Sequence, residues 1–285
     1  MIPAGFEYHR PDSIADVLGL LAEHGDEARV IAGGHSLIPM MKLRMAEFAH
    51  LIDLQAIAEM RGIRVGADGI VLGAMVTQHD LIAHDRLAEA APIIREAALQ
   101  IADPQVRYCG TLGGNVANGD PGNDMPGLMQ CLDAVYVLEG PDGRREVAAR
   151  EFYEAAYMTA REDEEILMEI RLPVPPAGHA YVKQKRKIGD YATAAAAVLI
   201  GKGADGTVDT ASVAMTNLGD VPVWSEIAGK DLVGSACDET AVAAAVDAML
   251  GDIDPVEDNR GPVEFKRHVA GVMLRRAIAA AWARA

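Results

Sequence analysis

Two double-glycine segments constrain this chain more than any other feature of its sequence. Gly33-Gly34 follows the apolar segment 29–32, and Gly113-Gly114 lies in a long polar stretch that precedes a helical segment. Adjacent glycines carry no side chain that blocks a ligand, and their dihedral angles can aim successive N–H groups at one point. Such loops bind anions, above all where a helix begins directly after them. The two segments therefore predict loops that grip phosphate groups.

Each segment taken singly is equally well explained as an ordinary turn, because short glycine motifs occur often by chance. Considered together, they favour a site in which two loops hold the two phosphates of one dinucleotide from opposite sides. Ser36, Thr111 and Asn115 would then add side-chain hydrogen bonds. A Rossmann site is disfavoured, and a P-loop is excluded because the sequence contains neither GKS nor GKT.

Hydrophobic periodicity and turn residues divide the chain into three parts. Residues 1–55 are expected to form a small α/β unit, with strands at 6–9, 29–32 and 50–54, a helix from Ser13 to His24-Gly25 and a helical segment at 37–43. Residues 56–175 are expected to form a second unit. Its predicted elements are strands 70–74 and 166–172, the hairpin 134–148, a helix after the capping box Thr77–Asp80, and the helix 92–101.

Pro173–Pro176 marks the boundary to a third part, residues 176–285. Here the pattern predicts an α+β domain with strands 180–185, 192–200 and 210–216, and helices 239–250 and 263–283.

The stretch Asp103–Asp124 is rich in glycine and asparagine and has almost no periodicity. Loops of this length inside compact domains are usually functional or disordered, and we predict an ordered binding loop. Asp124 directly precedes the predicted helix 125–132 and is most simply its N-cap, a role that leaves it free to bind a ligand as well.

Composition excludes several classes of protein. A formal charge of −16 argues against nucleic acid, whose phosphates require clustered Lys and Arg. The longest apolar runs, such as Ala192–Ile200, are far shorter than the roughly 20 residues that a bilayer needs, and the N-terminus does not look like an export signal.

The three cysteines form no CxxC, so we expect three small buried residues and no iron–sulfur cluster. No metal site is expected, because the eight histidines show neither HxH nor HExxH spacing.

A basic run and an aromatic residue in the third part leave alternatives open. Lys183, Lys185 and Lys187 alternate along a predicted strand and would share one face. They suit a solvated edge strand, and equally a cluster that faces phosphate or a reduced flavin. Tyr191 is either a half-buried tyrosine at a strand start or a ring stacked on a flat cofactor, and we favour the second. His35 is expected to shape its loop by hydrogen bonding and not to act as an acid or base. No catalytic residue is predicted.

Three motifs resemble a known family. AGGHSL at 32–37, TLGGN at 111–115 and NGDPGND at 118–124 are similar to the FAD-binding subunits of the xanthine dehydrogenase and carbon monoxide dehydrogenase group, the molybdenum hydroxylases. The similarity extends over essentially the whole chain. It implies an α+β protein with a FAD-binding domain of the vanillyl-alcohol-oxidase (PCMH) type, made of two α/β subdomains, and a C-terminal α+β domain.

The resemblance also implies which residues bind FAD. Residues Ala32, Gly33, Gly34, His35 and Ser36 and residues Thr111, Gly113, Gly114 and Asn115 would wrap the pyrophosphate. Ile101 and Leu167 match apolar positions near the flavin or adenine, Asp124 matches a carboxylate that binds polar parts of the cofactor, and Tyr191 matches a residue that covers the flavin ring. Lys183 matches a cofactor-contacting lysine, with Lys185 as the alternative register.

A member of this family is an electron-transfer subunit whose substrate chemistry takes place on another chain. The resemblance implies a large molybdopterin-binding partner, a small [2Fe–2S] partner, a dimer of heterotrimers and a quinone or other respiratory acceptor. Within the group it points to the branch that oxidises carbon monoxide; the alternative is a hydroxylase of purines, N-heterocycles, aldehydes or aromatic compounds. The expected location is the cytoplasm, with the inner face of the membrane as a variant. A free-standing flavin oxidase and an assembly module without FAD are the other classes considered.

Overall fold

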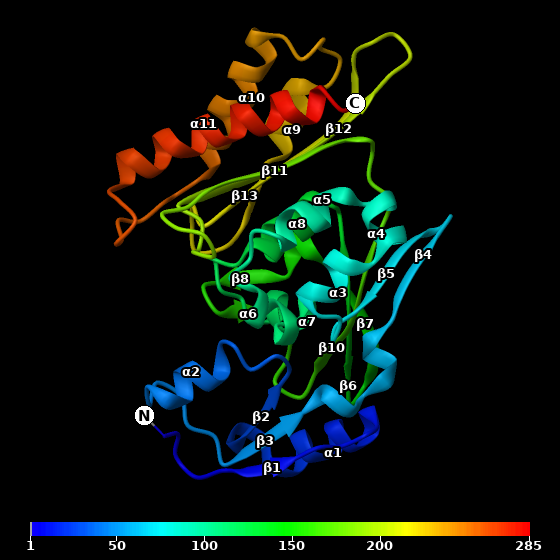
Figure 1. Cartoon of the computed structure of the whole chain (residues 1–285), viewed down its shortest axis with the longest axis vertical. Helices are drawn as coiled ribbons and strands as arrows, with labels where there is room; N and C mark the ends of the chain where they lie inside the picture. Colours follow the sequence, from blue (N-terminus) through cyan, green and yellow to red (C-terminus); the bar gives the residue numbers. More distant parts are fainter. Residues whose placement is uncertain (1) are drawn as a thin grey trace.

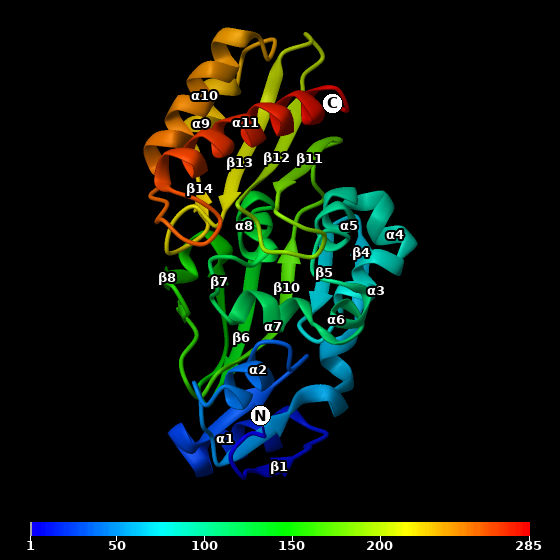
Figure 2. The same ribbon diagram turned by 60° about the vertical axis from the view of Figure 1, so that its left-hand side comes forward.

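The computed structural model describes residues 2–285 and contains three sheet-based units that follow one another along the longest axis of the molecule (Figures 1 and 2). The N-terminal unit lies at one end, a mixed helix-and-sheet unit lies in the middle, and a sheet covered by long helices lies at the other end. The predicted fold class, α+β with a C-terminal α+β domain, is confirmed. No helix among residues 2–285 is long and apolar enough to cross a bilayer.

The N-terminal unit is a parallel sheet in the order β1-β3-β2, with strands β1 (Glu7–His9), β2 (Ala28–Ile31) and β3 (His50–Asp53). Helix α1 (Ile14–His24) begins where the Ser13 hydroxyl accepts a hydrogen bond from the Asp16 N–H, and it ends at Gly25, whose φ is +49°. Short helix α2 (Leu37–Lys42) connects β2 to β3. Since the strands are parallel, the loop after β2 leaves the sheet at its carboxyl edge.

The middle unit is an antiparallel sheet with helices packed against it. Its strand order is β4-β5-β10-β6-β7, and the strands are β4 (Ile63–Gly66), β5 (Gly69–Gly73), β10 (Ile166–Leu172), β6 (Val135–Gly140) and β7 (Gly143–Ala148). The helices are α3 (Gln78–Ala83), α4 (Asp85–Ala90), α5 (Pro92–Ala98), α6 (Pro104–Cys109), α7 (Leu112–Ala117) and α8 (Asp124–Cys131). A small ribbon of β8 (Tyr153–Ala155) and β9 (Met158–Thr159) completes the unit.

The third unit is an antiparallel sheet of β11 (Gly178–Gln184), β12 (Ala194–Lys202), β13 (Val208–Thr216) and β14 (Val223–Trp224), with helices α9 (Glu226–Leu232), α10 (Glu239–Asp252) and α11 (Val263–Trp282). Strand β12 is buried on both faces, which explains its unbroken apolar sequence. One face contributes Ala194, Ala196, Val198 and Ile200 to a core with α9–α11, and the other contributes Ala195, Ala197 and Leu199 to the core of the middle unit.

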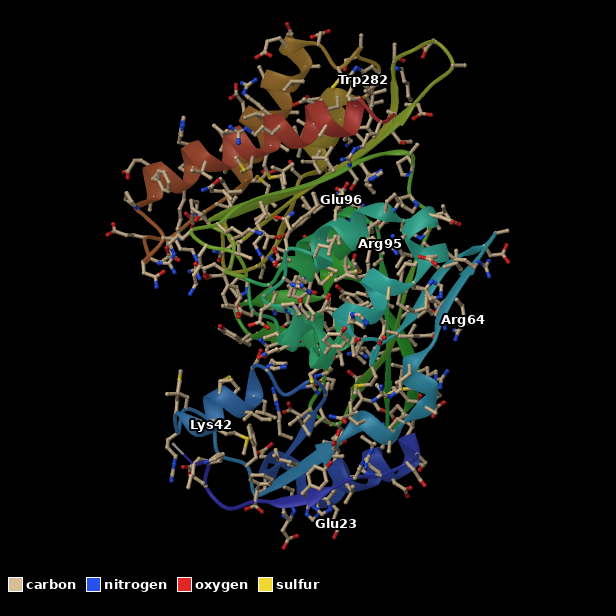
Figure 3. All side chains as sticks on the ribbon, viewed as in Figure 1. Glu23, Lys42, Arg64, Arg95, Glu96 and Trp282 are labelled. Carbon is tan, nitrogen blue, oxygen red and sulfur yellow. The ribbon has the colours of Figure 1, made fainter. Side chains whose placement is uncertain are left out.

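Polar contacts join the middle unit to the third unit. The Glu96 carboxylate of α5 accepts a hydrogen bond from the Arg284 guanidinium at 2.6 Å and another from the Tyr181 main-chain N–H at 3.2 Å. Glu96 and the C-terminal helix lie on the two sides of this junction in Figure 3. The two units are therefore held together by apolar packing and by a charged contact at its edge.

The structure corrects several predictions. The stretch 103–124 is not one loop, because it contains α6, which Asp103 caps, and α7, which Thr111 caps. The N-cap of α8 is Asn123, so Asp124 is the first helical residue. A Rossmann site was disfavoured on the expectation that the sequence has no GxGxxG, and this expectation is wrong, because Gly201–Gly206 has that spacing. The segment lies at the turn between antiparallel strands β12 and β13, where no helix follows to bind phosphate.

The cysteines were predicted to be uniformly buried, and this is wrong for Cys109, which is exposed at the end of α6. Cys131 is buried, and burial raises the pKa of its thiol to about 12; Cys237 is half-buried.

Because the thiolate is the reactive form, we expect iodoacetamide to alkylate Cys109 in the native chain while Cys131 stays unmodified. Peptide mass spectrometry before and after denaturation measures this. Early labelling of Cys131 would contradict the packing described.

Candidate cofactor-binding site

A cavity of about 480 Å³ lies where the three units meet. Its walls come from the loop after β2, from α6 and α7 with the start of β10, and from the segment after β11. Of the predicted cofactor-binding residues, Lys185 alone does not line it. All the other predicted residues line the cavity: Ala32, Gly33, Gly34, His35, Ser36, Ile101, Thr111, Gly113, Gly114, Asn115, Asp124, Leu167, Lys183 and Tyr191.

The first glycine loop presents free main-chain donors to this cavity. Among residues 2–285, no acceptor pairs with the N–H groups of Gly33, Gly34, His35 or Ser36. Gly34 has φ +73°, a conformation that residues with a side chain rarely adopt. Unpaired amides that line a cavity are the donors that an anionic phosphate group requires.

The second glycine motif has a different role from the one predicted. It forms the first turn of α7, and its amides are already paired: the Gly113 N–H donates to the Ala74 carbonyl at 2.8 Å, and the Gly114 N–H donates to the Thr111 hydroxyl oxygen at 3.0 Å. A Cβ on Gly113 would lie 2.7 Å from the Ala74 oxygen. Here the glycines permit close packing of α7 and do not form a second nest of free amides.

The loop that carries Gly33 packs against the segment from Cys109 to Gly114. A Cβ on Gly33 would lie 2.4 Å from the carbonyl oxygen of Cys109, and a Cβ on Gly114 would lie 3.4 Å from the Ala32 Cβ. The N-terminal and middle units therefore meet main chain against main chain at Gly33, which has no room for a larger residue, whereas a Cβ on Gly114 would make ordinary van der Waals contact with Ala32.

Three amide side chains in the cavity wall have buried polar atoms without a partner among residues 2–285. They are both amide atoms of Gln78, Oδ1 of Asn115 and Nδ2 of Asn118. Buried polar groups in folded proteins are nearly always hydrogen-bonded, so orphaned atoms that line a cavity indicate a bound polar molecule. Donors and acceptors mixed with free backbone amides fit the phosphates and the heterocyclic edges of a dinucleotide.

Gln78 and Asn118 were missed at the level of sequence. Gln78 is the first residue of α3 and lies inside the capping box, between Thr77 and Asp80, and no local pattern indicates that it points into a cavity. Asn118 begins the NGDPGND run, which could have drawn attention to it. Two basic residues in the wall were missed as well. They are Arg29 and Arg161. The pKa of Arg161 is lowered, first by burial and second by the positive charge of the nearby Arg29.

A buried charged cluster closes the cavity at the third unit. The Asp124 carboxylate accepts hydrogen bonds from the Lys183 ammonium at 2.7 Å and from the Tyr181 hydroxyl at 2.5 Å. The Lys183 side chain is 1% exposed. Burial raises the pKa of Asp124, and the adjacent ammonium opposes that rise. The predicted face of three lysines is only partly formed: the ammonium groups of Lys183 and Lys185 both donate to Gln100, while Lys187 lies beyond the end of β11 at Gln184.

Tyr191 lies in the cavity wall with 42% of its surface exposed, in the segment before β12 and not at a strand start. Its hydroxyl donates to Asp120 at 3.2 Å, and the Arg260 guanidinium lies 5.5 Å from the ring centre. Burial and the Asp120 carboxylate raise the pKa of Tyr191, so the phenol stays protonated. The ring is therefore held in a fixed position with part of its surface open to the cavity.

One cavity combines free main-chain amides, orphaned side-chain amides and an apolar wall, which defines a dinucleotide-binding protein. It is of another class than the Rossmann proteins, because the GxGxxG spacing at Gly201–Gly206 lies in a turn between strands and outside the cavity wall. Residues 4–175 match the family described as the FAD binding domain in molybdopterin dehydrogenase. Residues 179–281 match the family described as the CO dehydrogenase flavoprotein C-terminal domain.

Whole-chain comparisons agree with both matches. The carbon monoxide dehydrogenase medium chain of Afipia carboxidovorans is 57% identical, over 100% of this chain and 99% of that relative. The medium chain from Hydrogenophaga pseudoflava is 46% identical over the same shares. A chain in the structure of reconstituted CO dehydrogenase from Oligotropha carboxidovorans superposes with a TM-score of 0.98 at 56% identity, with 100% of both chains covered.

The chain belongs to the family of FAD-binding medium subunits of the molybdenum hydroxylases. It is an oxidoreductase subunit, and FAD is its cofactor, as the family resemblance predicted. Which side chains contact FAD stays a prediction.

The contact of Gly33 with Cys109 leads to a test of the first loop. We expect Gly33→Ala to lose most of its bound FAD, because the new methyl group would displace the loop from the main chain of α6. Gly19→Ala is the matched control: Gly19 lies within α1 with open space around it, so the change should leave FAD content intact and stabilise the helix by up to about 1 kcal/mol. Flavin absorbance per chain in the purified proteins measures the difference. Full FAD content in Gly33→Ala would exclude this loop as a cofactor contact.

The Asp124–Lys183 pair leads to a test by double-mutant cycle. Asp124→Asn leaves a buried ammonium without its counter-charge and should lower the free energy of unfolding by about 3–5 kcal/mol. Adding Lys183→Met to that variant should restore part of the loss, because no unpaired charge is then buried. Urea unfolding of the FAD-free proteins gives the coupling energy. If the double variant lost as much unfolding free energy as the two single variants together, the two groups would not interact.

Proposed function

We propose that this chain is the electron-relay subunit of a carbon monoxide-oxidising molybdenum hydroxylase. A large molybdopterin-binding partner would oxidise the substrate to CO2, and a small [2Fe–2S] partner would deliver the electrons to this chain. The final acceptor would be a quinone or another respiratory carrier. The observation that carries the proposal is a cavity that combines free loop amides with orphaned side-chain amides, in a chain 57% identical to a carbon monoxide dehydrogenase medium chain.

The residues of the cavity have separable roles under this proposal. The loop at Gly33–Ser36 would bind the diphosphate, and Thr111 and Asn115 would bind it from the other side. Ile101 and Leu167 would pack against the rings of the cofactor, and Tyr191 would cover part of the flavin and exclude water. When bound, FAD supplies chemistry in both one-electron and two-electron steps, which suits a relay between a cluster and a two-electron acceptor.

The Asp124–Lys183 pair supplies a fixed charge arrangement beside the cofactor. Its ammonium and carboxylate are 2.7 Å apart and nearly excluded from water, so their field is weakly screened. We propose that Lys183 contacts the cofactor and that Lys185, outside the wall, influences it only at a distance. His35 would orient the loop by hydrogen bonding and would not transfer protons.

The proposal extends to the organisation of the complex. Residues 1–55 and 56–175 would be the two FAD-binding subdomains and residues 176–285 the C-terminal domain. The assembly would be a dimer of heterotrimers located in the cytoplasm, with contact to the inner membrane face where the acceptor resides there. No residue of this chain is assigned to catalysis on carbon monoxide.

The test uses the complete complex under anaerobic conditions. Carbon monoxide should bleach the visible flavin absorbance, because electrons pass from the substrate site to FAD. The complex with Gly33→Ala is the control: carbon monoxide should still reduce the iron–sulfur clusters, while electron delivery to an added quinone is lost. Ready reduction by a purine or an aromatic substrate, and none by carbon monoxide, would refute the proposed substrate. Unimpaired quinone reduction by the FAD-free complex would refute the relay role.

A further inference from the structure

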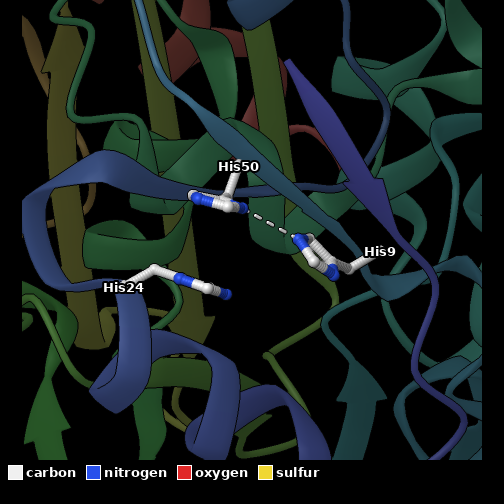
Figure 4. A group of neighbouring side chains, drawn as sticks. All are labelled: His9, His24 and His50. Carbon is white, nitrogen blue, oxygen red and sulfur yellow. Dashed lines mark hydrogen bonds between the residues drawn. The ribbon is translucent and has the colours of Figure 1, made fainter.

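Three histidines from distant parts of the sequence converge at the N-terminal unit. His9 ends β1, His24 is the last residue of α1, and His50 begins β3 (Figure 4). His9 and His50 share one face of the sheet, because Glu7 pairs with His50 in the parallel ladder and side chains alternate along each strand. The expectation that no metal binds considered only local spacing, and local spacing cannot detect ligands 15 and 26 residues apart.

The ring nitrogens of the three side chains lie close enough to share one ligand. Nε2 of His9 lies 3.0 Å from Nδ1 of His50, and the rings of His24 and His50 stack with centres 3.7 Å apart. One nitrogen from each histidine lies within 4.8 Å of the others. Two nitrogens bound to a tetrahedral ion at about 2.0–2.1 Å lie roughly 3.3 Å apart, so rotation of the His24 ring would complete the set.

The chemistry of these ligands selects the ion. Imidazole nitrogens suit the late first-row divalent metals, whereas Mg²⁺ and Ca²⁺ require oxygen ligands. A carboxylate is also at hand, because Oε2 of the exposed Glu7 lies 3.6 Å from Nδ1 of His50. A chain with a formal charge of −16 also attracts cations in general.

The cluster is separate from the FAD cavity. None of the three histidines belongs to the cavity wall, and His35, the one histidine in that wall, lies in the loop at the carboxyl edge of the sheet. An ion at the cluster would therefore act on the N-terminal unit and not on the cofactor directly.

We propose that His9, His24 and His50 form a binding site for one late first-row divalent metal ion, with Zn²⁺ as the ion it takes in the cell. The three imidazoles supply three ligands, and the Glu7 carboxylate or a water molecule occupies the fourth position. Such an ion ties β1, the end of α1 and β3 together. These elements support the loop that begins at Gly33, so the ion stabilises the unit that carries the first phosphate-binding loop.

The test uses the full chain purified without a histidine tag and treated with a chelator. Co²⁺ titration should give one saturable site with the visible absorption of a four-coordinate ion, and Zn²⁺ should displace the Co²⁺ and raise the melting temperature. His24→Ala should weaken binding by more than about 100-fold, since losing even an outer hydrogen-bond partner of a ligand costs roughly 10- to 100-fold. His268→Ala, at an exposed histidine of α11 outside the cluster, should bind as the unchanged chain does.

A second measurement keeps the proposal testable if a substitution disturbs folding. The electron paramagnetic resonance spectrum of the unchanged chain with one equivalent of Cu²⁺ should show coupling to three imidazole nitrogens. Binding that is equally strong in the unchanged chain and in His24→Ala, or a Cu²⁺ spectrum with fewer than three coupled nitrogens, would overturn the proposal. So would the absence of any saturable site, which would leave the cluster as a hydrogen-bonded and stacked group of imidazole rings.

Discussion

The architecture depends on main-chain contacts that only glycine permits. Gly33 lies against the end of α6, and Gly113 lies against Ala74 at the end of β5, each with no room for a Cβ. Because the opposing atoms belong to the backbone, they cannot move aside as a flexible side chain would. The contact of Gly33 fixes the N-terminal unit on the middle unit and positions the loop from Gly33 to Ser36, whose amides are free, whereas the contact of Gly113 packs α7 within the middle unit. The same steric constraint thus joins two units and forms the binding surface between them.

The sequence predicted well those helices that begin at a recognisable capping residue and are long enough to show a hydrophobic repeat. The start of α1 at Ser13 and the capping box of Thr77 and Asp80 at α3 were predicted and are present. Helices α6 and α7 were missed although Asp103 and Thr111 cap them, because six residues complete fewer than two turns and cannot display a hydrophobic repeat. Such short helices depend on tertiary packing for their stability, and packing is not visible in a local window.

The same difference between local signals and tertiary packing applies to the candidate site. The glycine motifs were visible because they are local, and their meeting at one dinucleotide was inferred from the two double glycines themselves; the family resemblance then identified the ligand as FAD. Gln78, whose amide is buried without a partner, could not be found, because its importance comes from its position opposite residues far away in sequence. The two glycine motifs also look alike in sequence but differ in function: the first leaves its amides free, while Thr111 and Ala74 accept those of the second. The difference arises because the second motif continues into a helix whose N-cap already uses its donors.

The third unit shows how a domain without glycine motifs can still shape the cavity. Strand β12 packs on both faces, so the sheet is anchored simultaneously to its own helices and to the middle unit. That anchoring holds Lys183 at the end of β11 within 2.7 Å of Asp124 at the start of α8. A buried ion pair contributes little net stability, since desolvation offsets much of the Coulomb attraction, but it fixes how two elements are oriented. The pair is therefore best understood as a constraint on the position of the third unit, and any movement of β11 relative to α8 would reach the cavity through these two side chains.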